Sequence, residues 1–178
     1  MVITDLQNKE SMSLNNEIIK EKLTAQFGEQ ILAWEESFGM LGVTVQKDAN
    51  LKVLTFLHDE ASLSFQFLTD LTGVHFPDRK GEELSVVYHL HNLVENIRMR
   101  MKIYAPIEKP DVYTATGLYS GANWMERETY DFYGVNFVGH PDLKRELNVD
   151  EMDYFPMRKE FPLEDQTRID KDDEMFGR

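Results

Sequence analysis

The chain has 178 residues, no cysteine and a formal net charge of −13 at pH 7. This length predicts one domain, and the 42% hydrophobic content is sufficient for a core. The negative charge argues against a nucleic-acid partner, because an acidic surface repels phosphates. The lack of cysteine excludes disulfides, thiolate zinc sites and cysteine-ligated iron–sulfur clusters in this chain.

The compartment is also indicated by composition. No apolar run is long enough to span a bilayer, and residues 1–17 lack the basic and apolar regions of a secretory signal. We therefore expect a cytoplasmic protein, and a peripheral position on a membrane complex stays open. Residues 1–14 are expected to be a flexible N-terminus.

The first half of the chain predicts a helix, a β-hairpin and a second helix. Apolar residues at helical spacing follow Asn15 and Asn16, either of which can cap the first helix. The dipeptide Phe38-Gly39 separates two short runs with strand character. The expected ranges are 15–28 for the first helix, 31–36 and 41–46 for the strands, and 51–60 for the second helix.

The middle of the chain is the most strand-like. Strands are expected at 65–75, 84–91 and 97–104, where apolar and β-branched residues are frequent. In the last of these, Arg98, Arg100 and Lys102 alternate with apolar residues and should share one face. Beyond two prolines, Asp111 is expected to cap a short helical turn that precedes a helix at 124–133.

These elements predict an α+β fold over residues 15–134, in which a mixed or antiparallel sheet is packed with helices. The character changes after Gly134. Residues 135–178 combine charges of both signs with prolines and show no sustained periodicity. We expect a long extended C-terminal arm that binds a partner and becomes ordered only on it.

The helix at 124–133 has an unusual outer face. Its inward face gathers Met125, Thr129, Phe132 and Tyr133, whereas Trp124 falls among charges on the other side. A large aromatic residue among charges suits a protein interface better than open water. The expected partner interface combines this helix, a basic His-Pro loop and the arm: Trp124, Arg127, Glu128, Asp131, His140, Lys144, Arg145, Tyr154, Phe155, Arg158, Lys159 and Phe161.

The carboxylates of this segment have structural explanations. Asn123-x-x-Glu126 matches a capping box, in which Glu126 serves the start of the helix. Glu128 and Asp131 share a helix face, and Arg127 lies one turn from Asp131. A structural or interface salt-bridge cluster is therefore favoured over an acid–base or metal site.

His89 and His91 would project from one face of a strand, which is a plausible metal-ligand spacing. No third ligand is evident near them, so a structural role is favoured. Nucleotide-binding and acyl-transfer motifs are also absent from the sequence. The residues alone favour an interaction subunit, and a free-standing carboxylate or metal enzyme is the alternative.

Several ordered motifs carry a family resemblance. They are Glu126-Arg127-Glu128, Asp131-Phe132-Tyr133, His140 and Lys144, with the segments Phe67–Arg79, Leu84–Ile103 and Tyr154–Asp165. Together they resemble the C subunit, a 30 kDa-type subunit, of respiratory complex I, the proton-pumping NADH:quinone oxidoreductase. The chain departs from the family pattern at Glu146, which is usually aliphatic, and at Tyr154-Phe155, where Gly-His is usual.

The resemblance implies an α+β domain whose C-terminal extension lies on the neighbouring D subunit of complex I, which holds the quinone site. It also implies a peripheral place in the hydrophilic arm, on the cytoplasmic side of the inner (cell) membrane. The chain would hold no cofactor and contribute to assembly, while NADH, FMN, iron–sulfur clusters and quinone would be used by other subunits. The family is also related to subunits of membrane-bound hydrogenases, so an equivalent subunit of such a complex stays open.

Overall fold

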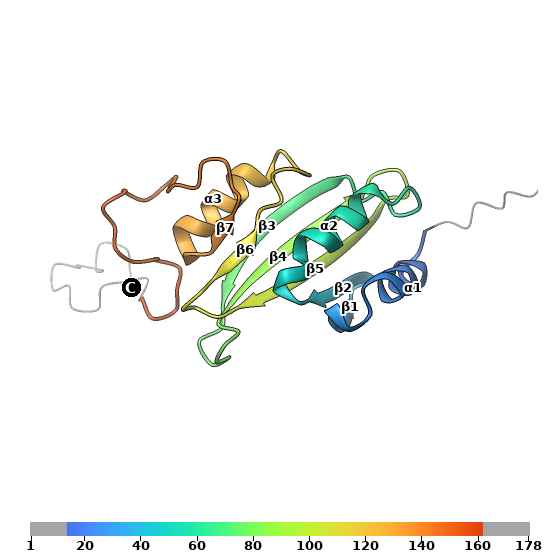
Figure 1. Ribbon diagram of the computed structural model, residues 1–178, viewed down its shortest axis with the longest axis horizontal. Helices are drawn as coiled ribbons and strands as arrows, with labels where there is room; N and C mark the ends of the chain where they lie inside the picture. Colours follow the sequence, from blue (N-terminus) through green and yellow to red (C-terminus); the bar gives the residue numbers. More distant parts are fainter. Residues whose placement is uncertain (1–13, 162–178) are drawn as a thin grey trace, which may run out of the picture.

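The centre of the molecule is a five-stranded mixed sheet, seen in a computed structural model that describes residues 14–161 (Figure 1). Its strand order is β1-β2-β5-β4-β3, in which β2 and β5 are parallel and all other neighbours are antiparallel. The prediction of a mixed sheet packed with helices is confirmed. The strands are β1 (Ile31–Ser37), β2 (Met40–Val45), β3 (Phe67–His75), β4 (Leu84–Asn92) and β5 (Ile97–Ala105).

Two helices of the first half, α1 (Asn16–Phe27) and α2 (Asn50–Asp59), lie side by side on the sheet (Figure 1). Asn15 caps α1 as predicted, since its side chain accepts a hydrogen bond from the Ile18 amide at 2.9 Å. The rings of Phe27 and Phe56 join the two helices edge to face, with centroids 5.5 Å apart. Short 3₁₀ turns, η1 (Gly28–Gln30) and η2 (Lys47–Ala49), connect these helices to the strands.

The core lies between the sheet and the helices. Met99, Met101 and Ile103 of β5 are fully buried, and the basic residues that alternate with them lie on the opposite face. The predicted alternation in β5 is thus confirmed. The outer face of the sheet carries a row of paired charges instead: Lys102 and Arg100 reach Glu35, at 2.7 and 3.6 Å.

The remaining elements are β6 (Asp111–Tyr113), α3 (Ala122–Tyr133) and β7 (Asn136–Val138), and β6 pairs with β7 in a small parallel sheet. The helical turn expected at Asp111 is wrong, because Asp111 begins a strand. Its pairing partner, Asn136, lies 25 residues further along the chain, where a local pattern cannot reveal it. Strand β7 falls in the range expected to be the arm, yet Val135 and Phe137 are part of the core.

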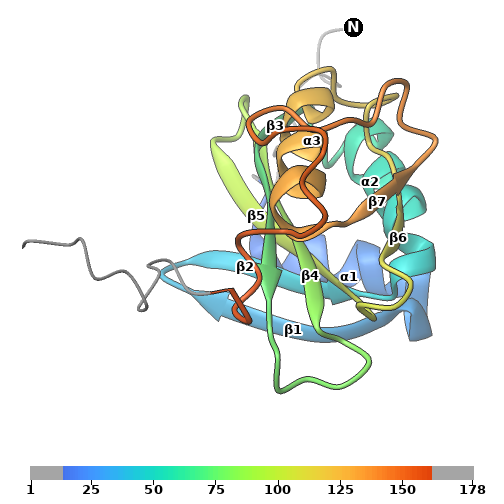
Figure 2. The ribbon, with the colours of Figure 1, turned by 90° about the vertical axis from the view of Figure 1, so that its left-hand side faces the viewer.

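Figure 2 shows residues 139–161 winding past α3. No helix within residues 14–161 is long and apolar enough to cross a bilayer. The predicted flexible N-terminus, up to residue 13, and residues 162–178 of the predicted arm lie outside the described residues.

Candidate functional site

Helix α3 is held close to β3 at Gly73. A Cβ atom on this glycine would lie 2.5 Å from the ring of Tyr133 and 3.0 Å from the methyl group of Thr129. The absence of a side chain therefore lets the helix approach the strand. Thr129 and Tyr133 face the domain, as the helical wheel predicts.

Glu126, a residue of α3, has a fully buried side chain. Its carboxylate accepts hydrogen bonds from the Ala115 amide at 2.6 Å and from the Thr114 hydroxyl at 2.5 Å. Burial raises the pKa of Glu126 to about 7, although both hydrogen bonds oppose this shift. The predicted capping box is wrong, because α3 starts at Ala122 with no side-chain cap. Glu126 instead ties α3 to the segment that follows β6.

Asp131 forms the centre of the site, and it is also fully buried. Its carboxylate accepts hydrogen bonds from the backbone amides of Glu146, Leu147 and Asn148, at 3.1, 2.8 and 3.0 Å. The guanidinium of Arg145 lies 2.8 Å from the same carboxylate. Burial alone would raise the pKa of Asp131, but the amides of Asn148 and Leu147 together with Arg145 lower it well below its usual range. Asp131 is therefore ionised and saturated with donors from its own chain.

Arg145 extends this network along the chain. Besides the carboxylate, its guanidinium donates to the carbonyl oxygen of Asp131 at 3.0 Å. It also donates to the carbonyl oxygens of Met152 and Tyr154, at 2.8 and 2.9 Å. The ring of Phe155 lies under the guanidinium, 5.0 Å from its centre. One buried ion pair thus fixes most of the chain between residues 144 and 155.

Arg127 faces the same segment but does not pair with Asp131. Its guanidinium donates to the carbonyl oxygens of Lys144 and Arg145, each at 3.4 Å, and stacks over the Trp124 ring at 4.8 Å. A charge cluster was predicted here from the one-turn spacing of Arg127 and Asp131. That cluster is not formed, because Asp131 pairs with Arg145 instead and Glu128 is exposed. Trp124 itself stays 60% exposed.

The loop of His140 is fastened to the start of α3. The ring Nε2 donates to the carbonyl oxygen of Asn123 at 3.1 Å, and Nδ1 accepts from the Asp142 amide at 3.1 Å. Lys144 pairs with Asp142 at 2.7 Å, in an exposed position. Glu128, on the outer face of α3, is exposed as well.

Residues 155–161 continue over the C-terminal end of α3. The helix ends at Gly134, which has φ +77°, and a Cβ atom there would lie 2.5 Å from the Phe155 ring. Arg158 donates to the Tyr133 carbonyl oxygen at 2.8 Å, and its guanidinium lies 4.6 Å from the centre of the Phe155 ring.

The same segment contacts the sheet at Lys159, directly after Arg158. The Lys159 amide donates to Nδ1 of His75 on β3, at 2.9 Å, and the Glu160 carboxylate lies 3.7 Å from the same ring nitrogen. The Tyr154 and Phe161 rings pack together with centroids 4.9 Å apart. We refer to residues 140–161 as the arm segment.

The predicted interface residues fall into three groups by exposure. Arg127 and Asp131 are buried; His140, Arg145, Phe155, Arg158 and Phe161 are partly buried; Trp124, Glu128, Lys144, Tyr154 and Lys159 are exposed. The predicted interface includes Tyr154 but not the other exposed apolar side chains of the arm segment, Leu147, Val149 and Met157. Their signal was their alternation with polar and acidic residues after residue 146. We call the exposed apolar set the α3–arm surface: Trp124, Leu147 (68% exposed), Val149 (63%), Tyr154 (40%) and Met157 (46%).

The two histidines considered as metal ligands have separate partners. His89 accepts a hydrogen bond from Arg100 at 3.0 Å, whereas the ring of His91 is 3.1 Å from the Asn96 side-chain oxygen. Within residues 14–161, no group of three or more His, Asp or Glu side chains is arranged to hold a metal ion.

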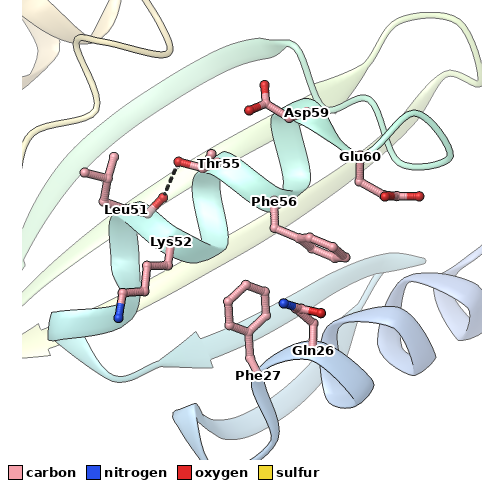
Figure 3. Close-up of a pocket in the computed structure, with 8 residues that line it drawn as sticks. All are labelled: Gln26, Phe27, Leu51, Lys52, Thr55, Phe56, Asp59 and Glu60. Atoms are coloured by element: carbon pink, nitrogen blue, oxygen red, sulfur yellow. Dashed lines mark hydrogen bonds between the residues drawn. The ribbon is translucent and has the colours of Figure 1, made fainter.

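A groove of about 660 Å³ lies between α1 and α2 (Figure 3). Phe27 and Phe56 point toward one another across it. Its Thr55 hydroxyl donates to the Leu51 carbonyl oxygen at 2.8 Å, and its Glu60 pairs with Lys22 at 3.3 Å. These polar groups are thus used within the fold, which leaves the α3–arm surface as the better candidate site.

Comparisons with known proteins agree on one family. The family model for the 30 kDa subunit of respiratory-chain NADH dehydrogenase matches residues 43–167. The chain is 41% identical over 151 residues to the C subunit of NADH-quinone oxidoreductase from Rhizobium rhizogenes, covering 85% of this chain and 74% of that protein. It is 36% identical over 174 residues to the subunit of the same name from Caulobacter sp. strain K31, covering 97% and 80%.

Solved structures show the same fold. The trypsin-resistant fragment (1-134) of Nqo5 has a TM-score of 0.61 and 32% identity, covering 71% of this chain and 98% of that one. A chain of the membrane-bound sulfane sulfur reductase, an archaeal respiratory membrane complex, has a TM-score of 0.67 and covers 83% of this chain and 85% of its own length. That chain is 24% identical, which is a likeness of fold alone. The chain belongs to the family of the 30 kDa subunit of respiratory-chain NADH dehydrogenase, also named the C subunit of NADH-quinone oxidoreductase.

Proposed function

We propose that this chain is a non-redox structural and assembly subunit in the hydrophilic arm of a proton-translocating NADH:quinone oxidoreductase. The chain docks on the D subunit through the α3–arm surface. We call the D subunit the quinone-site subunit below. The chain lies peripherally, on the cytoplasmic side of the cell membrane. NADH, FMN, iron–sulfur clusters and quinone are handled by other subunits, and the isolated chain is not catalytic. Family membership and the architecture around Asp131 support this proposal.

The observation that carries the proposal is the use of Asp131. Its side chain is fully buried and its carboxylate accepts five hydrogen bonds from the arm segment, so it has no free edge for a substrate. A buried ion pair of this kind selects one arrangement of the chain. Here that arrangement leaves Leu147 and Val149 exposed on an ordered segment. A surface ordered in advance loses less conformational entropy when a partner binds.

A free-standing carboxylate or metal enzyme has less support. Glu128 is exposed while Asp131 is enclosed by the arm segment, so these two carboxylates do not converge on one space. His89 and His91 are engaged by Arg100 and Asn96, respectively.

The fold is also found in a sulfane sulfur reductase complex, and the chain could serve an equivalent hydrogenase-type assembly on that basis. Identities of 41% and 36% to subunits of NADH-quinone oxidoreductase favour NADH-quinone oxidoreductase as the complex. The two candidates differ in which subunits accompany the chain.

The test is co-purification of the quinone-site subunit with the affinity-tagged chain from the source organism. The double variant Leu147→Ser/Val149→Ser removes apolar contacts at two exposed positions. As a control, Leu32→Ser changes an apolar side chain on β1 that is 53% exposed. The double variant should recover about tenfold less of the quinone-site subunit, as for the loss of central interface contacts, and the control should recover the wild-type amount.

Both variants should keep the circular dichroism spectrum of the wild type, since neither change lies in the core. Undiminished recovery of the quinone-site subunit with the double variant would contradict the proposal. Recovery of hydrogenase-type subunits in place of NADH dehydrogenase subunits would select the other assembly.

A further inference from the structure

The end of the sheet where β2 and β5 begin is a second exposed region. Two turns meet there because these strands are parallel, with Leu41 opposite Met99. One turn is Phe38-Gly39, between β1 and β2, and the other is residues 93–96, between β4 and β5. The Asn16 side chain at the start of α1 donates to the Gly39 carbonyl oxygen at 3.3 Å. In Figure 1 this end lies beside α1, whereas α3 and the arm segment lie toward the other end of the long axis.

Within residues 14–161, the fold gives the Phe38 ring no packing role. Its relative exposure is 107%, so the ring is fully open to solvent in the described part of the chain. Its φ of +52° and the φ of +76° at Gly39 lie in the left-handed region, as in the tight turns that favour Asn-Gly. A bulky residue costs roughly 1–2 kcal/mol in that conformation. A strained and exposed aromatic side chain of this kind motivates a functional hypothesis.

Apolar side chains and two arginines lie near Phe38, although the adjacent turn also carries the exposed Glu95. The adjacent turn exposes Leu93 by 64% and Val94 by 89%. A groove of about 700 Å³ beside Phe38 is lined by Arg98 and Arg100, with other residues of the two turns and of α1. Of the described residues that line this groove, none is acidic, although the whole chain has a net charge of −13. We call this set the turn surface: Phe38, Leu93, Val94, Arg98 and Arg100.

We propose that the turn surface is a second docking site, whose occupant is a protein subunit that presents carboxylates beside an apolar pocket. Phe38 enters the pocket, while the exposed Arg98 binds a carboxylate. Aromatic residues, phenylalanine among them, and arginine are enriched at protein interfaces, and arginine binds carboxylates through two parallel hydrogen bonds.

The two arginines of the groove differ in their partners. The Arg100 guanidinium donates to His89 at 3.0 Å and lies 3.6 Å from Glu35, so its charge is used within the fold, whereas Arg98 is exposed and is the better ligand for a carboxylate. A membrane surface is less favoured as the occupant, because two arginines do little to offset the negative charge of the whole chain against anionic lipids.

The first experiment places the photo-crosslinker benzoylphenylalanine at position 38 of the tagged chain within the assembled complex. This substitution exchanges one aromatic side chain for another. The same crosslinker at Lys80, in the exposed β3–β4 loop, is the control. Position 38 should crosslink to a single protein subunit, and position 80 should not reach that subunit. Crosslinks to lipid or to a second copy of the chain, or no crosslink at all, would overturn the proposal.

The second experiment separates binding from folding. Phe38→Asn supplies the residue that this turn favours, so the melting temperature should stay equal or rise. The same variant should lower the recovery of the crosslinked subunit about tenfold. Arg98→Glu should also lower it, whereas Lys80→Glu, with the same change of charge, should not.

Recovery equal to wild type for both Phe38→Asn and Arg98→Glu would overturn the proposal. The outcome does not depend on the partner of the α3–arm surface. Recovery of the quinone-site subunit is measured in the same preparations, so a failure of the proposed function is recognised separately.

Discussion

Asp131 and Glu126 are both buried on α3, but their environments shift their pKa values in opposite directions. Asp131 is surrounded by donors, among them the guanidinium of Arg145, and these outweigh the effect of burial. Among the described residues, only Thr114 and Ala115 donate hydrogen bonds to Glu126, and the effect of burial on its pKa dominates. The first carboxylate is therefore ionised, and the second changes its protonation near neutral pH.

Replacement of Asp131 by Asn should release the arm segment. One carboxylate oxygen becomes an amide group that faces only donors, and Arg145 keeps a buried charge without a counterion. We expect a loss of about 3–5 kcal/mol in the free energy of unfolding at pH 7, measured by urea denaturation.

The lowered pKa of Asp131 adds a test by pH. The stability that Asp131 contributes is fully present above its unfolded pKa of about 4, and is lost as the pH falls below that value. The difference in stability between wild type and Asp131→Asn should therefore narrow by roughly 1 kcal/mol per pH unit below pH 4. A difference that stays constant from pH 6 to pH 3 would mean that the carboxylate is not held in this network.

Glu126→Gln should give the opposite dependence on pH. The folded chain holds a proton on Glu126 up to a pKa of about 7, whereas the unfolded chain releases it near the ordinary value of 4.5. The free energy of unfolding of the wild type should thus fall, relative to Glu126→Gln, as the pH rises from about 4.5 to about 7. The total change should be at most about 3 kcal/mol. Parallel stability curves for the two proteins over this range would contradict the burial of a protonated Glu126.

At the scale of elements, the end of α3 and the arm segment meet at Gly134. Gly134→Ala places a side chain at φ +77° and also against Phe155. Gly81→Ala is a matched control, because Gly81 has φ +84° and nothing within 4 Å of an added Cβ atom. The control should lose only the backbone term, roughly 1–2 kcal/mol, and Gly134→Ala should lose more.

The arm segment itself provides the decisive readout for Gly134→Ala. Displacement of Phe155 and Arg158 should speed hydrogen exchange of the amides in residues 145–158, while the exchange of β4 and β5 changes little. If the amides of the arm segment exchange at the same rate in Gly134→Ala and Gly81→Ala, the effect of Gly134→Ala comes from the backbone conformation alone and not from contact with Phe155.

Elements with a local or periodic signal could be predicted from the sequence, and long-range contacts could not. The Asn15 cap and the alternation in β5 depend on neighbouring residues, so the pattern was sufficient. The roles of Glu126 and Asp131 depend on partners 11 to 17 residues away, on segments without periodicity. The spacing Asn123-x-x-Glu126 fits a capping box, but it occurs equally well inside a helix whose glutamate turns toward another segment.

The whole molecule presents two candidate surfaces that are chemically different and lie toward opposite ends of its long axis (Figure 1). The α3–arm surface carries exposed apolar residues between acidic ones, such as Leu147 and Val149 beside Glu146 and Asp150. The turn surface carries apolar residues beside Arg98 and Arg100. A chain of this form can bridge two neighbours, and the rigid sheet between the surfaces would fix their separation.

If the chain bridges two neighbours, a change in one surface should abolish binding of one neighbour and leave binding at the other surface intact. Leu147→Ser/Val149→Ser should yield complexes that lack one neighbour, and Phe38→Asn complexes that lack another. The combined variant should yield the free chain, because sites far apart with no shared contacts act additively. Native mass spectrometry of the tagged chain identifies which subunits stay bound in each case. Loss of the same subunit in both single variants would mean that one partner spans both ends, and bridging would then be wrong.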